Sequence, residues 1–301
     1  MGELTLRQLQ YFVAVVDHGS VTAAADACHV SQAAASMAIA QLEKSLGVDL
    51  LIRSQSRRLS PTAAGTEFAA HARAVLERLA EAEAVVSESV GQMRGALRVG
   101  CSPTLSPRLI PPLVQFFTRH HPQIDLRISE GAPVQTQDDV RHGRLDLAFG
   151  YAWQADTDLR REHIADVRLQ VMLAAGHPLA GRKSVHLAEI VHEPAVILNV
   201  PPTAERLIAL VQSLGLELDI KLTSTNMETI RSLVGRGLGF SFVNSAPATG
   251  TTFDGLEVVY IPVADAMPQN SIVAMLPAGH AVPRRVSAAL EVLRDDVRSH
   301  P

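Results

Sequence analysis

The segment from Ser20 to Gly47 constrains this chain more than any other sequence feature. It reads SVTAAADACHVSQAAASMAIAQLEKSLG, and nine of its 28 residues are alanine, so helices formed here can pack with their backbones close together. Ser20 and Ser31 are favourable helix N-caps, and Gly47 is a favourable C-terminal stop. The spacing predicts a short helix ending near Cys28, a tight turn, and a longer helix that begins at Ser31.

An apolar stripe with helical periodicity precedes this segment. Thr5 is a favourable cap for that helix, and His18-Gly19 is a favourable stop. The stripe consists of Leu6, Leu9, Phe12, Val13 and Val16. The chain is therefore expected to open with three helices, the last two joined by a tight turn.

The helix from Ser31 has one apolar face and one small, nearly uncharged face. The apolar positions recur at steps of four, three and four, and they are Ala35, Ile39, Leu42 and Leu46. The opposite face carries Gln32, Ala33, Ser36, Met37 and Ala40. Such a slim face can enter a DNA major groove, where Gln32 can pair with an adenine edge and Ser36 can bind bases or phosphates. The alternative is a small helical bundle in which the alanines only fill a core.

A short basic segment follows these helices. Between residues 50 and 60 the sequence has an apolar run, then a polar loop, and then a second short extended stretch. The pattern predicts a two-stranded wing that presents Arg53, Arg57 and Arg58 to the DNA backbone or to the minor groove. A solvated basic loop is the alternative interpretation.

Charge limits what one copy of this segment can do. Over residues 1–62, five basic side chains balance five acidic ones, and the whole chain has a formal net charge of −4. A general polyanion binder would carry excess positive charge, and neutral protein surfaces bind DNA weakly. A dimer or larger assembly is therefore needed to sum the contacts.

These pieces together resemble the N-terminal part of the LysR-type transcriptional regulators. The resemblance is carried by LRQLQYFVAVVDHGSVTAAADACHVSQAAASMAIAQLEKSLGVDLLIR and by SPTAAG at Ser60 to Gly65. It implies a winged helix-turn-helix whose third helix faces the bases and whose wing holds the DNA backbone. The DNA-binding residues implied in this way are Ser31, Gln32, Ala33, Ser36, Met37, Arg53, Arg57 and Arg58.

Four positions depart from the usual pattern of that family. Ala33 stands where proline is usual, and Leu51 stands where phenylalanine is usual. Pro61 replaces an apolar residue before Thr62. Met37 stands where a basic residue is common, so one phosphate or guanine contact usual in that family is not expected from this helix, while the fold is expected to stay the same.

A long helix is expected next, capped by Thr62 or by Ser60 with Pro61, and reaching roughly to Gly91. At 1.5 Å per residue, a helix of about 30 residues spans about 45 Å. Its apolar stripe has spacings close to those of a coiled coil and consists of Phe68, Ala72, Val75, Leu79, Ala82, Val86, Val90 and Met93. The stripe predicts pairing with a second copy of the chain, and packing against the chain's own C-terminal body is the alternative. The family resemblance favours a homodimer, or a homotetramer built from two dimers.

From Arg94 onward, strand and helix patterns alternate, which predicts an α/β arrangement with parallel strands. The resemblance implies two lobes like those of periplasmic binding proteins. We expect a DNA-binding domain at 1–62, a linker helix at 63–93 and an effector-binding domain at 94–301. Lobe one would contain 94–166 and 271–301, and lobe two would contain 167–270. The run GRGLGFSFVN is expected to form a turn near the lobe boundary and not a phosphate loop, because its glycines do not follow a strand.

Two predicted strand-to-helix loops are candidates for binding a small molecule between the lobes. Their hydroxyl and amide side chains precede helix N-termini, which attract anions, so a small carboxylate effector fits them. The candidate effector-binding residues are Ser102, Thr104, Asn199 and Thr203, together with Glu130 at the end of another strand. Helix capping by Thr104 and Thr203 alone is the alternative, and the charge of the effector stays open.

Other classes of function find little support in the sequence. Cys101 near His120-His121 lacks a nucleophile motif, and the twelve histidines show no metal-ligand spacing. No signal peptide or membrane span is evident. We therefore expect a cytoplasmic, non-enzymatic regulator without metal or cofactor. Its expected partners are promoter DNA, a small metabolite, a second copy of itself and, as a candidate, RNA polymerase. The alternatives are a solute-binding protein and an enzyme that uses the cleft.

Overall fold

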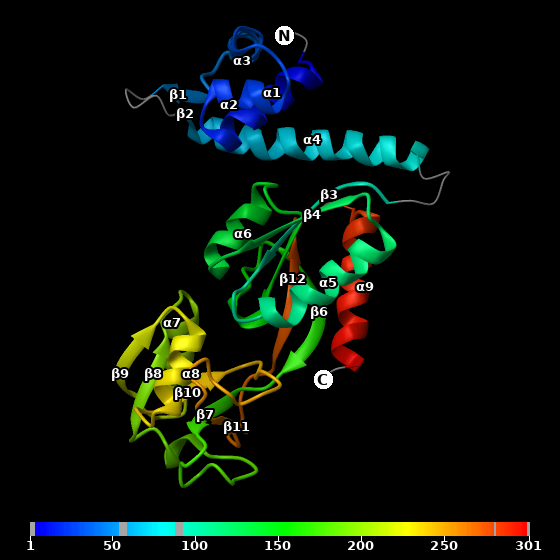
Figure 1. The fold of residues 1–301 in the computed structure, drawn as a ribbon. Coiled ribbons are helices and arrows are strands. Elements are labelled where there is room, and N and C mark those ends of the chain that lie inside the picture. Colours follow the sequence, from blue (N-terminus) through cyan, green and yellow to red (C-terminus); the bar gives the residue numbers. More distant parts are fainter. Residues whose placement is uncertain (1–3, 54–58, 88–92, 280, 300–301) are drawn as a thin grey trace.

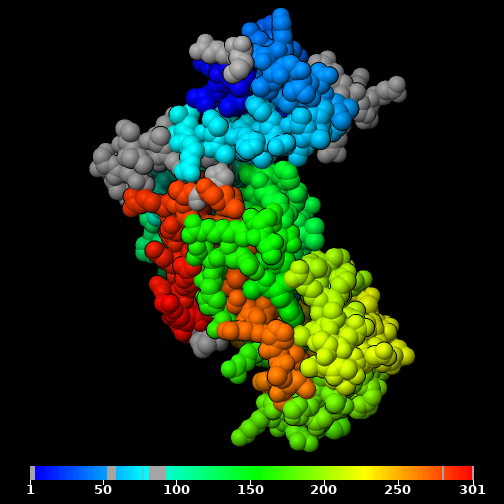
Figure 2. Space-filling view, turned by 180° about the vertical axis from the view of Figure 1, so that it is seen from behind, coloured from blue at the N-terminus to red at the C-terminus, as the bar shows by residue number. Residues whose placement is uncertain are grey.

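The computed structural model describes residues 4–53, 59–87, 93–279 and 281–299. Figure 1 shows a helical N-terminal unit, a long helix beneath it, and two α/β lobes that follow one another away from that helix. The space-filling view in Figure 2 shows the long helix (cyan) between the N-terminal unit (blue) and the first lobe.

The N-terminal unit begins and ends its helices where the sequence predicts. It contains α1 (Leu6–His18), α2 (Val21–Ala27), α3 (Gln32–Leu46), β1 (Leu51–Arg53) and β2 (Leu59–Pro61). Thr5 caps α1 in a reciprocal capping box with Gln8, and Ser20 and Ser31 cap the next two helices. Glycines in the left-handed conformation follow α1 and α3. The strands β1 and β2 pair antiparallel, which confirms the predicted wing.

The long helix α4 (Ala63–Ser87) follows directly. Thr62 is its cap, because the Thr62 hydroxyl accepts a hydrogen bond from the Gly65 amide at 2.9 Å. The apolar stripe does not all face outward as predicted. Phe68 packs against Phe12 of α1 with ring centroids 5.5 Å apart, and Ala72 is buried.

The remaining stripe positions differ in their exposure, and Leu79 is half-buried. Met93 packs against the core of the first lobe, so it too is used within the chain. Val75 is 47% exposed and is free to meet a partner. The predicted stripe positions Ala82 and Val86 lie outside the described side chains, and Val90 lies outside the described residues.

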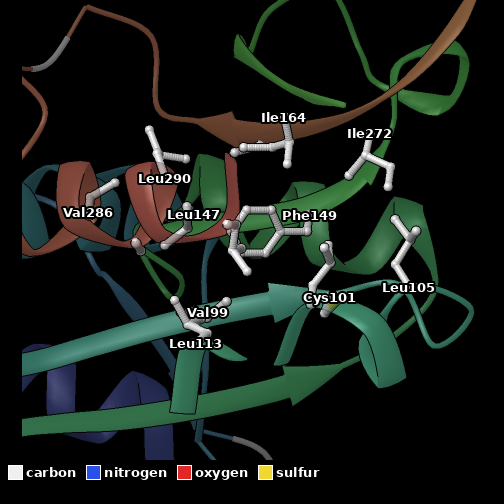
Figure 3. Close-up of a cluster of buried hydrophobic side chains, with 14 of the residues drawn as sticks. Val99, Cys101, Leu105, Leu113, Leu147, Phe149, Ile164, Ile272, Val286 and Leu290 are labelled. Carbon is white, nitrogen blue, oxygen red and sulfur yellow. The ribbon is translucent and has the colours of Figure 1, made fainter. Parts of the chain in front are cut away.

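The first lobe is a five-stranded sheet with the order β4-β3-β5-β12-β6. Its strands are β3 (Gly95–Cys101), β4 (Ile124–Glu130), β5 (Leu147–Tyr151), β6 (Arg160–Val167) and β12 (Asn270–Leu276). Its helices are α5 (Ser106–His120), α6 (Pro133–Arg141) and α9 (Arg284–Ser299). Figure 3 shows the core, where Val99, Leu147 and Phe149 of the sheet meet Leu113 of α5 and Leu290 of α9.

The second lobe is built from two small sheets. Its strands are β7 (Gln170–Ala174), β8 (Pro194–Leu198), β9 (Asp219–Ser224), β10 (Ser241–Val243) and β11 (Val258–Pro262). Its helices are α7 (Thr203–Ser213) and α8 (Met227–Gly235). The order β10-β7-β11 forms one sheet and β8-β9 the other, and a bridge between Ala195 and Phe240 links them.

The expectation of parallel strands is only partly correct. The strand β3 runs parallel to β4 and β5, and β8 runs parallel to β9. The strand β12 runs antiparallel to β5 and β6, and β7 runs antiparallel to both of its neighbours. The physical reason is the connectivity: β6 leaves the first lobe and β12 returns to it, so the two run in opposite directions side by side. The alternating pattern also missed β6 altogether.

The glycine-rich run forms the turn between α8 and β10, as expected. Gly237 has φ +71° and Gly239 has φ +144°, in a region that residues with side chains rarely adopt. A Cβ at Gly239 would lie 2.2 Å from the Pro194 carbonyl oxygen, so the backbone of β8 can approach only a glycine here.

Among the described residues, no helix is long and apolar enough to cross a membrane.

Candidate functional site

The helix α3 presents one exposed face to solvent. Ala35, Ile39 and Leu42 are almost fully buried on its other side. The five predicted positions on this helix, Ser31, Gln32, Ala33, Ser36 and Met37, are all exposed. Met37 is 70% exposed, so its side chain on this face is open to contact with another molecule.

The exposed face is held in place by packing and by one carboxylate. Ile39 packs with Val15 of α1 and Ala24 of α2, so the small alanine side chain lets the helices cross closely. The Glu43 carboxylate accepts hydrogen bonds from the Leu50 and Leu51 amides at 2.8 and 3.1 Å. This contact fixes the start of the wing relative to α3.

The wing is anchored, but its arginines are only partly described. The Leu59 amide donates to the Gly19 carbonyl at 2.9 Å, which ties β2 to the turn between α1 and α2. The backbone of Arg53 pairs with Leu59 at the end of β1. The other two predicted wing residues, Arg57 and Arg58, lie outside the described residues.

A cavity of about 600 Å³ lies between the two lobes. Its lining includes three of the five predicted effector-binding residues, namely Ser102, Thr104 and Thr203. Glu130 and Asn199 are not among the lining residues. The Glu130 carboxylate instead accepts a hydrogen bond from the Ser106 hydroxyl at the exposed end of β4. The strand β8 ends just before Asn199. The backbone amide of Asn199 donates to the Ser224 carbonyl at 2.8 Å, and Asn199 is exposed at the surface.

Neither threonine caps a helix, so the capping alternative is wrong. The N-caps of α5 and α7 are Leu105 and Pro202, and neither makes a side-chain capping bond. The Thr104 hydroxyl lies 3.2 Å from the Ser102 hydroxyl. The Thr203 hydroxyl accepts a hydrogen bond from the Gln154 side-chain amide at 2.7 Å. Both threonines therefore line the cavity, and neither caps a helix.

Among the described residues, side-chain hydrogen bonds cross between the lobes around the cavity. One is the bond from Gln154 of the first lobe to Thr203 of the second. Arg108 donates to the Ser245 hydroxyl at 3.1 Å. The side-chain amide of Asn270 donates to that of Asn244 at 3.4 Å. These polar contacts therefore help to set the relative position of the lobes, together with Trp153, which packs against the cores of both.

The charged side chains that line the cavity are paired with other groups of the protein. Arg231 donates to the Glu228 carboxylate at 2.7 Å and to the Tyr260 hydroxyl at 2.9 Å. It also donates to the Thr249 and Thr251 carbonyls. Burial raises the pKa of Tyr260, although Arg231 opposes this shift, so the Tyr260 hydroxyl stays protonated near neutral pH. The rest of the lining is apolar or neutral, as in Trp153, Leu169 and Phe242.

Sequence reasoning missed several of these cavity residues. Arg231 lies three positions after Glu228, and this helical spacing in METIRS is a signal that could have indicated a pair. Gln154 and Asn244 belong to no motif, and they reach the cavity only because the two lobes fold together.

An exposed third helix, a two-stranded wing and a ligand-sized cavity between two α/β lobes are together typical of ligand-responsive, DNA-binding regulators. Residues 6–66 match the family described as bacterial regulatory helix-turn-helix protein, lysR family, and residues 91–298 match the LysR substrate binding domain. The chain belongs to the LysR family of transcriptional regulators, which bind DNA and carry an effector-binding domain.

Individual relatives cover nearly the whole chain. A protein of Dickeya chrysanthemi named hydrogen peroxide-inducible genes activator is 28% identical over 299 residues, covering 99% of this chain and 96% of its own length. The crystal structure of HinK, a LysR family regulator of Pseudomonas aeruginosa, is 30% identical with a TM-score of 0.63, covering 97% of this chain and 98% of its own. A variant of full-length OxyR from Pseudomonas aeruginosa is 26% identical with a TM-score of 0.74, and 98% of each chain is covered.

The name of the first relative raises the question of whether peroxide acts on this chain through a thiol. A cysteine reacts with peroxide as an accessible thiolate. Cys101 is fully buried in the core of the first lobe (Figure 3). Burial, with a smaller contribution from the Glu130 charge, raises the pKa of the Cys101 thiol, and burial also raises the pKa of Cys28. Neither thiol is activated for peroxide chemistry.

We predict that Cys101 stays reduced when the native chain meets excess hydrogen peroxide near neutral pH. Its raised thiol pKa lowers the thiolate fraction below that of an ordinary cysteine at this pH, and burial excludes the oxidant. Mass spectrometry after alkylation in urea measures the outcome. The same treatment of chain already unfolded in urea is the control, in which Cys101 oxidises. Sulfenic or sulfinic acid on Cys101 of the native chain would contradict this account.

Proposed function

We propose that α3 reads promoter DNA from the major groove and that the wing contacts the backbone beside it. The observation that supports this most is the shared exposure of Ser31, Gln32, Ala33, Ser36 and Met37 on the side of α3 away from its core. Gln32 lies in the first turn, where recognition helices contact base edges, and a glutamine amide can bind both N6 and N7 on the major-groove edge of adenine. Arg53, Arg57 and Arg58 supply charge for phosphates.

Replacing Gln32 with alanine tests the base-reading role. Gln32→Ala should cost about 1–3 kcal/mol of binding free energy and relax base preference at one position in each half-site. Competition binding with a library of site variants measures this, starting from DNA beside the protein's own gene. Gln10→Ala, the same change on exposed α1, is the matched control and should leave the preference intact. A uniform loss across all site variants would remove Gln32 as a base reader.

We infer that the working protein is a homo-oligomer, a homodimer or a homotetramer. Because the N-terminal unit has no net charge over residues 1–62, two copies are needed for it to bind DNA well. The exposed part of the α4 stripe, which includes Val75, supports a partner at this helix. The edge strands β4 and β9 also expose apolar side chains, namely Ile128, Ile220 and Leu222. Exposed edges of this kind are available for pairing with another chain.

A charge placed on α4 should weaken that association. In Val75→Glu, a carboxylate would have to be buried in the helix pair, so the oligomer should dissociate toward the 32.3 kDa chain. Light scattering on a size-exclusion column measures the mass. Val48→Glu, at a similarly exposed valine outside α4, should keep the mass of the unmodified protein. A monomeric unmodified protein would contradict the dimer, and an unchanged Val75→Glu oligomer would place the interface elsewhere.

We propose that the cavity binds a small organic effector. Its volume suits a metabolite, and its lining combines apolar walls with neutral hydroxyls and amides that can orient a ligand. Binding between the lobes would shift their relative position and so change how two N-terminal units meet DNA.

Thermal unfolding of the full chain against a panel of metabolites tests this proposal. A ligand present at about 100 times its Kd adds about 2.7 kcal/mol, which raises Tm by roughly 5–10 °C for a domain of this size. Val200→Trp, which fills the cavity, should abolish the rise. Val134→Trp, on the exposed start of α6, should preserve it. A Tm rise that survives Val200→Trp would place the effector outside the cleft.

The remaining expectations follow from the same role. We infer that the chain acts in the cytoplasm, where promoter DNA and RNA polymerase are found, and that it regulates without catalysing a reaction. The transcriptional regulators to which it is similar support this inference.

A further inference from the structure

The side chain of Arg73 on α4 joins three parts of the molecule. It is only 4% exposed. One guanidinium nitrogen donates to the Asp17 carboxylate on α1, and another donates to the His142 carbonyl at 2.8 Å. His142 is the C-cap of α6, so a single side chain connects the N-terminal unit, α4 and the first lobe. Figures 1 and 2 show α4 between these two bodies.

The helix α6 is fastened at its middle to the segment that follows β5. Gln137 of α6 is 1% exposed, and its side-chain amide donates to the Gln154 carbonyl at 3.1 Å. Its side-chain oxygen accepts from the Asp156 amide at 2.6 Å. Because buried polar groups are costly to leave unpaired, these two hydrogen bonds make α6 and this segment move together.

Gln154 continues the connection into the cavity. Its side chain is 3% exposed and donates to the Thr203 hydroxyl of the second lobe at 2.7 Å. Its side-chain oxygen is buried and has no hydrogen-bond partner among the described residues. A buried amide oxygen without a partner is costly, so a rearrangement that gives it a hydrogen-bond donor is favourable. The Gln154 side chain can gain such a donor by breaking its bond to Thr203.

We infer that these contacts form one route by which the state of the cleft reaches the DNA-binding unit. The route runs through Thr203, Gln154, Gln137, α6, His142, Arg73 and Asp17. A change in lobe position displaces Gln154, Gln137 carries the displacement to α6, and Arg73 carries it from α6 to α1. Arg73 is thus a positioning residue for α1 and, through their shared core, for α3. The inference rests on the proposed function and specifies how its cleft would be coupled to its DNA-binding unit.

Amide hydrogen exchange of the full chain, without DNA or effector, tests the route. Thr203→Val removes the hydroxyl that accepts from Gln154 while keeping the side-chain shape. It should raise exchange in α1 at least about fivefold, the lower end of typical coupling between sites. Thr104→Val makes the same chemical change in the same cavity but off the route, and it should leave α1 unchanged. His71→Ala, on the exposed side of α4, is the control for altering that helix.

A double-variant comparison identifies Arg73 as the connection. In Arg73→Met, exchange in α1 should already be raised, and adding Thr203→Val should raise it no further. Asp17→Asn, a milder change at a more exposed side chain, should behave in the same way and serves if Arg73→Met does not fold. A response to Thr203→Val confined to the second lobe, or one that adds fully to Arg73→Met, would overturn the inference. The readout needs no DNA, so a failure here is distinct from an absence of sequence-specific binding.

Discussion

The burial of Ala35, Ile39 and Leu42 against α1 and α2 turns the opposite side of α3 toward solvent, and the rest of the molecule's function depends on this orientation. Alanine in α2 lets the helices approach closely, and serine caps set where each helix begins. The result is a thin, exposed helix that carries amide, hydroxyl and methyl groups. A bulkier or more charged face would bind phosphates more strongly but would read bases with less discrimination.

The N-terminal unit is nearly neutral, so its affinity for DNA depends on how the rest of the molecule arranges it. Because one copy gains little from phosphate attraction, affinity has to come from two copies held at a suitable distance. In the proposed oligomer α4 holds the two copies together, and within one chain it rests on the first lobe through the buried Arg73. The same helix can therefore present two N-terminal units to DNA and receive a displacement from the lobe beneath it. The hydrogen bonds that bridge the cleft, such as that from Gln154 to Thr203, are the contacts that the proposed effector would compete with.

Local sequence signals predicted the N-terminal unit well because helix caps and glycine stops act between neighbours. Thr5, Ser20 and Ser31 each bond within three residues, so no distant part of the chain can override them easily. Arg73 could not be predicted in this way, since its partners His142 and Asp17 lie 69 and 56 positions away. The apolar stripe of α4 predicted a helix correctly. It could not reveal that Phe68 and Ala72 are buried by the chain itself.

The residues that line the cleft could also be predicted only where a local sequence signal marks them. Strand-to-helix loops pointed to Ser102, Thr104 and Thr203, which line the cavity, whereas Glu130 and Asn199 are not among its lining residues and Gln154 carried no local signal.

Methylation protection by dimethyl sulfate tests the central claim most directly, because this reagent attacks guanine N7 in the major groove. The full chain bound to DNA from beside its own gene should protect guanines in two half-sites, separated by about one helical turn or a multiple of it. An unchanged methylation pattern on DNA that is fully bound would contradict the placement of α3 in the major groove.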